Sequence, residues 1–164
     1  MRLNLREIIE VPGRSIPFDC DIHSENLDFE SVKCYESPLH ASGLVFNEAG
    51  ILRLTGEVSA DMVCICDRCG AEFNSSKTTE LDAVITEEES EENPELFTLD
   101  GDELDLDELI STCFILDMET KFLCREDCKG ICSGCGVNLN VGTCTCRKQI
   151  DPRFAVLEQL LDKD

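Results

Sequence analysis

The sequence predicts an α+β fold, in which an antiparallel β-sheet domain is joined to two helices and a small Cys-rich zinc-binding module. Three features of the 164-residue chain predict this fold. Apolar and polar residues alternate through much of the N-terminal half, two later segments have helical spacing, and six of the 12 cysteines lie between Lys121 and Lys148. Because 42 % of the residues are hydrophobic, the chain can bury a core.

Three or four antiparallel strands are expected within residues 1–86, where the hydrophobic period is two. The segment 51–58 places leucines on one face, and Arg53 and Thr55 on the other, as in a half-buried strand. Further elements are expected as follows: strands at 39–46 and 73–85, a tight connection at Asn47–Gly50, and a strand or bulge over 33–40 that Pro38 interrupts.

Two helices are expected in the second half of the chain. Asp105 caps the first, over residues 105–120, because apolar residues follow it at helical spacing and Glu108 stands three residues later, as in a capping box. Asp151, followed by Pro152 at the first helical position, starts the second helix within 150–164. Residues 87–104 form an acidic connector between the sheet domain and the first helix, and the zinc module occupies 121–149.

Paired cysteines can supply two zinc sites, since a structural zinc ion takes four thiolate or imidazole ligands at tetrahedral corners. The pairs are Cys66/Cys69, Cys124/Cys128, Cys132/Cys135 and Cys144/Cys146. The last two pairs enclose only residues 136–143, which favours one compact site and leaves the first two pairs to form a long-range site. A rival pairing joins Cys124/Cys128 to Cys132/Cys135, and Cys66/Cys69 to Cys144/Cys146.

Other uses of the cysteines stay open at this point. Four thiolates also suit an iron–sulfur cluster, and a disulfide framework is the alternative if the compartment is oxidising. Cys64 shares a strand face with Cys66, so it is either a spare ligand or a core residue. Cys113 lies on the apolar face of the first helix and is expected to be a small core residue.

Composition and motifs exclude several classes of function. A net charge of -21 does not suit a protein that grips nucleic acid through its phosphates. The chain has no apolar run of the roughly 18–20 residues that a membrane helix needs, and its N-terminal segment lacks the layout of a signal peptide. No glycine motif for phosphate and no Ser–His–Asp arrangement stands out, and a closed four-thiolate site leaves no position for a reacting water. We therefore expect a protein that is not an enzyme.

Several segments together resemble the YceD family, whose members are called large ribosomal RNA subunit accumulation proteins. The similar segments are Cys66-Asp-Arg-Cys69 after a strand, the helix start at Asp105–Leu109, the string LCREDCKGICSGCGVNLNVGTCTC at 123–146, the opening LNLREIIEVPGRSIPF and the closing DPRFAVLEQLL. The resemblance covers essentially the whole chain. It implies a bacterial or organellar cytoplasmic protein needed for accumulation or processing of large-subunit (23S) ribosomal RNA, and it supplies no catalytic residues.

The acidic stretch from Glu87 to Glu108 is then the expected contact for a basic partner, such as a basic ribosomal protein or an rRNA-processing factor. No Lys or Arg occurs between Thr78 and Thr120, and the densest acidic block consists of Glu87, Glu88, Glu89, Glu91 and Glu92. The alternative is that this block is a solubilising linker. Two rival functions are direct RNA binding, through Lys121, Arg125, Lys129, Arg147 and Lys148 around the zinc module, and a thiol-based zinc or redox sensor.

Overall fold

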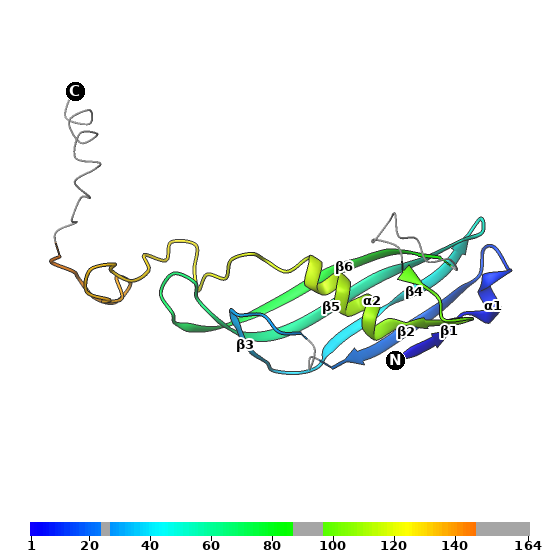
Figure 1. The fold of residues 1–164 in the computed structure, drawn as a ribbon, viewed down its shortest axis with the longest axis horizontal. Coiled ribbons are helices and arrows are strands. Elements are labelled where there is room, and N and C mark those ends of the chain that lie inside the picture. Colours follow the sequence, from blue (N-terminus) through cyan, green and yellow to red (C-terminus); the bar gives the residue numbers. More distant parts are fainter. Residues whose placement is uncertain (24–26, 87–96, 147–164) are drawn as a thin grey trace, which may run out of the picture. The chain divides into compact units, whose positions relative to one another are not determined.

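The structure is a computed structural model that describes residues 1–23, 27–86 and 97–146 (Figure 1). The chain divides into two compact units. The first comprises Met1–Asp67 and Ala71–Cys124, and the second comprises Arg68–Gly70 and the chain from Arg125 onward. The first unit contains the strands and helices, and the second contains most of the Cys-rich segment.

A six-stranded sheet is the main element of the first unit. The elements are β1 (Arg2–Asn4), α1 (Arg6–Ile9), β2 (Ser15–Ile22), β3 (Val32–Tyr35), β4 (Leu39–Glu48), β5 (Ile51–Ile65), β6 (Glu72–Thr86), β7 (Phe97–Thr98), β8 (Glu103–Asp105) and α2 (Leu106–Leu116). The strand order is β2-β4-β5-β6-β7, and β3 pairs with the end of β5 beyond β4. All pairs in the sheet are antiparallel except β6 with β7, while β1 and β8 form a separate antiparallel pair.

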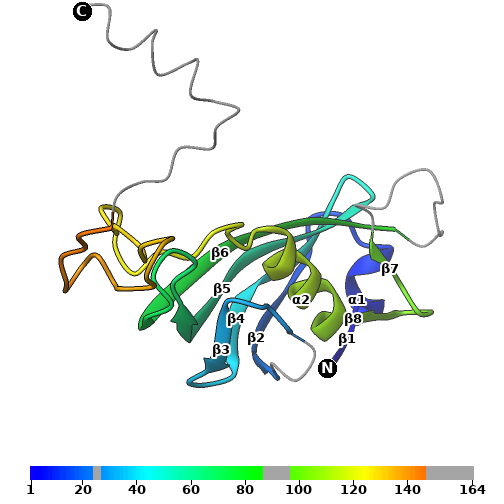
Figure 2. The same ribbon diagram turned by 60° about the vertical axis from the view of Figure 1, so that its left-hand side comes forward.

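The hydrophobic core lies on the face of the sheet that α2 covers (Figure 2). Side chains along β5 and β6 alternate between buried and more exposed, so that Leu54, Met62 and Leu81 point into the core. From α2, Leu109 and Phe114 are fully buried in the same cluster. The opposite face of strands β2, β4, β5 and β6, here called the outer face, carries the alternate residues of each strand.

The long strands and the start of α2 agree with the sequence-based predictions, whereas α2 ends at Leu116 and not at residue 120. The predicted strands at 39–46, 51–58 and 73–85 lie within β4, β5 and β6, and the turn at 47–50 contains positive φ at Ala49 (53°) and Gly50 (96°). Asp105 is the N-cap of α2, and its side chain accepts hydrogen bonds from the backbone N–H groups of Asp107 and Glu108. The strand or bulge predicted over 33–40 is divided in the structure, because β3, with an irregular register between Val32 and Cys34, ends at Tyr35, and β4 begins after Pro38.

Other elements were not predicted. β2 alternates regularly, but Pro17, its third residue, argues against a strand; the structure places β2 at the sheet edge, where a proline is tolerated. The short elements α1, β1 and β8 carry too few residues for a periodic signal. The helix predicted within 150–164 and the acidic block of Glu87–Glu92 lie outside the described residues. Neither helix in the described part of the chain is long and apolar enough to span a bilayer.

Asp117 links the C-terminal end of α2 to β6 through an ion pair and a hydrogen bond. Lys77 Nζ lies 2.9 Å from Asp117 Oδ2, and the hydroxyl of the buried Thr79 donates a hydrogen bond of 2.9 Å to the same oxygen. The bond from Lys77, followed by the bond from Thr79, holds the pKa of the Asp117 carboxyl below its usual range. A negative charge at a helix C-terminus is unfavourable with the helix dipole, so these two partners offset that repulsion.

Leu109→Ala should lower the free energy of unfolding by about 2–5 kcal/mol, because it removes buried methyl groups and leaves a cavity under α2. Leu116→Ala on the same helix is the matched control, since Leu116 is 77 % exposed, and it should change that free energy by less than about 0.5 kcal/mol. Urea unfolding of the two variants measures the difference. Equal losses would show that α2 does not bury this face.

Asp117→Asn should remove an acid-sensitive part of the stability. Because the folded-state pKa of Asp117 lies below its unfolded value of about 3.9, its stabilisation is present above that pH and is lost as the pH falls through the folded pKa. The wild type should therefore lose its advantage over the variant between about pH 5 and pH values below 4. Urea unfolding at a series of pH values measures this, with Asp102→Asn in the turn before β8 as the control. The same convergence in the control would contradict the assignment to Asp117.

Candidate metal centres

The structure gathers eight cysteines into two groups of four. The first group is Cys66, Cys69, Cys124 and Cys128, and the second group is Cys132, Cys135, Cys144 and Cys146. Within each group the four sulfur atoms all lie within 4.8 Å of one another. A tetrahedral zinc ion with Zn–S distances of about 2.3 Å spaces its sulfurs about 3.8 Å apart, so both groups fit such an ion. The grouping is the pairing that the sequence analysis preferred, and the rival pairing is not adopted.

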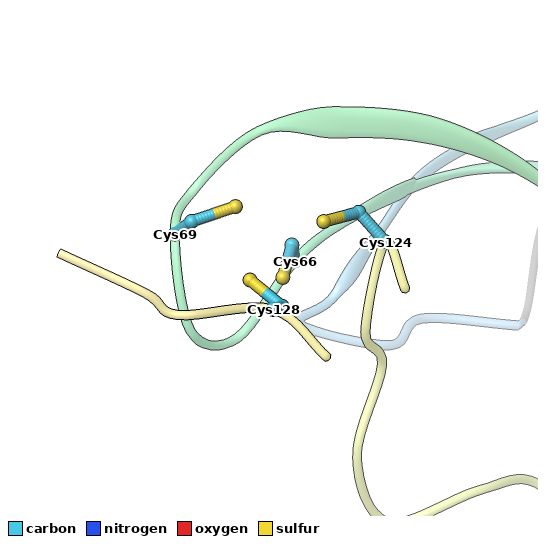
Figure 3. Close-up of side chains that lie close together, drawn as sticks. All are labelled: Cys66, Cys69, Cys124 and Cys128. Carbon is cyan, nitrogen blue, oxygen red and sulfur yellow. The ribbon is translucent and has the colours of Figure 1, made fainter. Parts of the chain in front are cut away.

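The first group begins at the turn between β5 and β6. Cys66 follows β5, its N–H donates a hydrogen bond of 2.9 Å to the carbonyl oxygen of Ala71, and Cys69 lies within the turn. Gly70 closes the turn with φ of +67°, which an L side chain rarely adopts. The sulfur atoms of all four cysteines point toward a common centre (Figure 3). Three of the four are buried, with exposures of 1 % for Cys66, 9 % for Cys69 and 4 % for Cys128.

Asp67, inside the Cys66–Cys69 turn, holds the segment that leads to Cys124. Its backbone N–H donates to the carbonyl oxygen of Phe122 at 2.9 Å, and its Oδ2 accepts from the N–H of Phe122 at 2.6 Å. Oδ1 accepts a bond of 2.6 Å from the hydroxyl of Ser31. The bond from Ser31, and then that from Phe122, keeps the pKa of Asp67 below its usual range. Asp67 is therefore held as a carboxylate that fixes the position of residue 122.

Arg68, the other middle residue of the turn, holds the segment around Cys128. Its Nη1 donates to the carbonyl oxygen of Cys128 at 3.0 Å, and its own carbonyl oxygen accepts from the N–H of Ile131 at 3.1 Å. Gly130 has φ of +74°, and a Cβ there would lie 2.9 Å from the carbonyl oxygen of Arg68. Both the conformation and the close approach thus require glycine at residue 130.

The second group lies on a short hairpin in the second unit. Cys132 N–H donates to the carbonyl oxygen of Val137 at 2.9 Å, and Gly136, with φ of +73°, donates to the carbonyl oxygen of Cys132 at 2.8 Å. The sulfur of Cys144 lies 3.2 Å from that of Cys132 and 3.5 Å from that of Cys135. In contrast to the first group, the second has two exposed members, Cys135 and Cys146.

Backbone N–H groups point at sulfur atoms in the second group. Gly134 N–H donates to Cys132 Sγ at 3.4 Å, and Cys146 N–H donates to Cys144 Sγ at 3.2 Å. The sulfur atoms of Cys144 and Cys135 raise the pKa of Cys146 to about 12, whereas backbone donors from Cys135 and Gly134 lower the pKa of Cys132 to about 6 and so favour its thiolate. The thiolate is the form that binds a metal ion, so this environment suits a ligand.

The remaining cysteines of the described chain lie outside the two groups. Cys64 is fully buried in the hydrophobic cluster of the first unit, and burial raises the pKa of its thiol, so it is a core residue rather than a spare ligand. Cys20 is buried in the same cluster, Cys113 packs against it, and Cys34 is exposed.

The sequence pattern identified the cysteines but not the side chains that position them. Asp67 and Arg68 act through hydrogen bonds to residues more than 50 positions away, which no periodicity reveals. A third such residue is Asn140, whose side-chain Nδ2 donates to Cys128 Sγ at 3.3 Å. The only sequence signal for the first two is that they separate the cysteines of a CxxC pair.

Chemically, both groups can hold Zn²⁺ as a closed, four-sulfur structural site, and the same ligands also suit an iron–sulfur cluster. Such a site supplies folding energy rather than a position for a substrate. Metal binding stays a prediction for all eight cysteines, which are Cys66, Cys69, Cys124, Cys128, Cys132, Cys135, Cys144 and Cys146.

Comparison with known proteins agrees with the family resemblance. A family profile described as large ribosomal RNA subunit accumulation protein YceD matches residues 54–161. A chloroplastic YCED homolog 1 from Zea mays is 26 % identical over 179 residues, which cover 89 % of this chain and 61 % of the maize protein. An uncharacterized protein of Mycobacterium tuberculosis is 35 % identical over 118 residues, covering 68 % of this chain and 56 % of that protein.

A second chloroplastic YCED homolog 1, from Arabidopsis thaliana, is 26 % identical over 159 residues, which cover 77 % of this chain and 50 % of that protein. The chain thus spans between half and about three fifths of the length of these curated relatives. No solved structure matches it significantly. Because the family profile covers more than half of the sequence, the chain belongs to the YceD family of large ribosomal RNA subunit accumulation proteins.

Proposed function

We propose that the protein is a non-enzymatic accessory factor of ribosome biogenesis, in the cytoplasm or a plastid, which is held together by two zinc ions and binds a basic protein partner. The observation that carries this proposal is the convergence of eight cysteines into two four-sulfur groups. The names of the maize and Arabidopsis relatives support the link to accumulation of large-subunit ribosomal RNA. The bound partner would be a basic ribosomal protein or an rRNA-processing factor.

Zinc would have a structural role at both groups. At the first group, the Cys66–Cys69 turn and the segment with Cys124 and Cys128 are separated by more than 50 residues, so one ion would crosslink distant parts of the chain. At the second group, an ion would close the loop of residues 136–143. Metal bound only by the folded chain stabilises that chain by mass action.

Metal binding would also make the protein more acidic. Four thiolates and one Zn²⁺ carry a net charge of -2, so each site adds negative charge to a chain that already has -21. The basic side chains near the cysteines, which include Lys121, Arg125 and Lys129, are then largely neutralised. This balance favours a basic protein over RNA as the partner.

The outer face of the sheet supports the same partner class. Its exposed carboxylates include those of Asp19, Asp21, Glu57, Asp61, Glu80 and Asp82. Glu57 and Glu80 are direct cross-strand partners, an arrangement that destabilises a sheet. A hollow of about 580 Å³ on this face is lined in part by Glu57, Glu80 and Asp82. Lysine and arginine side chains of a partner would relieve this repulsion, because they would place positive charge between the two glutamates.

On the same face, the guanidinium of Arg53 already binds a carboxylate of the protein itself. Its Nε and Nη2 each donate a bond of 2.6 Å to Asp82, one to each carboxylate oxygen. The carboxylates of Glu57 and Glu80 are therefore the stronger candidates for an external cation. The block of Glu87, Glu88, Glu89, Glu91 and Glu92, which lies outside the described residues, follows β6 in the sequence and carries five further negative charges.

Purified protein should contain two zinc ions per chain, measured by inductively coupled plasma mass spectrometry on protein prepared without chelator. Cys132→Ser should reduce the content to one, because it removes a ligand from the second group only. Cys66→Ser should likewise leave one, at the second group. Cys34→Ser is the matched control, since Cys34 is exposed and belongs to neither group. Zero metal, or iron with sulfide, in the wild type would contradict the zinc proposal.

Immobilised protein should retain basic proteins from an extract of total large-subunit ribosomal proteins at low salt, and lose them as the salt concentration rises. The triple variant Asp19→Asn, Glu57→Gln, Glu80→Gln should retain several-fold less, and so should a variant in which Glu87, Glu88, Glu89, Glu91 and Glu92 become Gln. Quantitative mass spectrometry of the eluted proteins measures the loss.

The control for net charge is the triple variant Glu7→Gln, Glu10→Gln, Glu30→Gln, whose exposed side chains lie outside the outer face. It should behave as the wild type does. An equal loss of retained proteins in this control would show that the interaction depends only on the overall charge of the protein. Unchanged retention in both acidic-surface variants, or tight binding of naked 23S ribosomal RNA in place of protein, would contradict the proposed partner.

A further inference from the structure

Asn140 connects the two cysteine groups. It lies in the loop of residues 136–143, which is bounded by the two cysteine pairs of the second group, yet its side chain contacts the first group. Its Nδ2 donates a hydrogen bond of 3.3 Å to the sulfur of Cys128. Its Oδ1 accepts a bond of 2.8 Å from the backbone N–H of Lys129, the next residue along the chain.

The orientation of this amide is fixed by its neighbours. Nδ2 also donates to Asn138 Oδ1 at 2.9 Å, so both of its hydrogens are used. A flipped amide would turn its oxygen toward the sulfur of Cys128 and the oxygen of Asn138, and would turn its NH₂ group toward the N–H of Lys129. Every contact would then be between two acceptors or two donors. The side chain therefore presents a donor, and only a donor, to the sulfur.

The loop that carries Asn140 is built on the second group. Ile131 and Asn138 form a β-bridge next to Cys132, and Leu139 N–H donates to the carbonyl oxygen of Gly130 at 2.9 Å. Asn138 then turns the chain, because its carbonyl oxygen accepts from Gly142 N–H at 2.9 Å, and its Oδ1 accepts from Asn140 N–H at 2.9 Å. A metal ion on the four flanking cysteines would close this loop and hold Asn140 against Cys128.

We propose that Asn140 couples the two metal centres, so that metal at the second group raises the affinity of the first group for metal. This inference rests on the proposed zinc binding. A hydrogen bond to a ligand thiolate disperses its negative charge, and such outer partners typically change metal affinity by about 10–100-fold. Here the donor is ordered by the loop of the other site. Because coupling between binding sites is reciprocal, metal at the first group raises the affinity of the second by the same factor.

The coupling has a structural basis in the two different surroundings of the groups. In the second group, backbone N–H groups of the hairpin itself donate to Cys132 and Cys144. One donor to Cys128 is a side chain, which comes from a residue 12 positions away in the sequence. Removing this side chain leaves all eight cysteine ligands in place, so the coupling can be measured separately from metal binding itself.

The test measures metal affinity at the first group by competition with a chromophoric chelator, using Zn²⁺, and by the sulfur-to-metal absorbance of the Co²⁺ form. Asn140→Ala should weaken the first group by about 10–100-fold while the protein still binds two ions at saturation. Asn140→Asp, which has nearly the same shape but offers an acceptor, should weaken it further. Asn74→Ala, at an exposed position of β6, is the matched control and should leave both affinities unchanged.

A double-mutant cycle separates coupling from local structure. In Cys132→Ser, the second group no longer binds metal, so the first group should already be weakened, and adding Asn140→Ala should change its affinity less than about threefold. If Asn140→Ala weakens the first group equally with and without Cys132, the two centres are not coupled through this residue. Affinity within twofold of wild type in both Asn140 variants would also overturn the proposal. A wild-type chain that binds no metal at all would instead contradict the zinc proposal itself.

Discussion

Four sulfur atoms held close together in a mostly buried setting are the constraint on which the rest of the structure depends. The sulfurs of the first group lie within 4.8 Å of one another, and three of the four cysteines are buried. Thiolates at this spacing repel one another strongly in a poorly solvated site unless a cation lies between them. The Cys66–Cys69 turn reaches this position because β5 and β6 pair without interruption from Leu52 and Ile85 to Ile65 and Glu72. A slip of one residue in that pairing would turn every side chain of one strand to the other face.

The two residues between Cys66 and Cys69 make that turn specific for its partner segment. Asp67 exchanges two hydrogen bonds with the backbone of Phe122, and Arg68 binds the backbone on either side of Gly130. The pairing of the two cysteine segments therefore does not depend on the cysteines alone, because directed hydrogen bonds already bring the segments together. A metal ion would then stabilise an arrangement that these hydrogen bonds already favour. Asp67 and Arg68 would act as outer-shell residues do in other metal sites. A closed four-thiolate zinc site would carry a net negative charge, so it would add to the negative charge of a protein that is already acidic.

Local signals in the sequence were sufficient for the long strands, for α2 and for the list of candidate ligands. Alternation in 51–58 marks a half-buried strand, and Asp105 caps its helix through hydrogen bonds that span only three residues. β2 could not be identified with the same rules, because a proline is acceptable only at the sheet edge, and edge position is a property of the whole fold. The roles of Asp67, Arg68 and Asn140 could not be predicted from the sequence for a similar reason. Each depends on hydrogen bonds to backbone or sulfur atoms that tertiary structure brings near.

The most direct test of the central claim is X-ray absorption spectroscopy at the zinc K-edge of the purified wild-type protein. If both groups hold zinc in closed sites, the spectrum should fit a single shell of four sulfur atoms at about 2.3 Å from the metal. A shell that contains nitrogen or oxygen at about 2.0–2.1 Å would contradict the account, because it would mean open sites or other ligands than the eight cysteines.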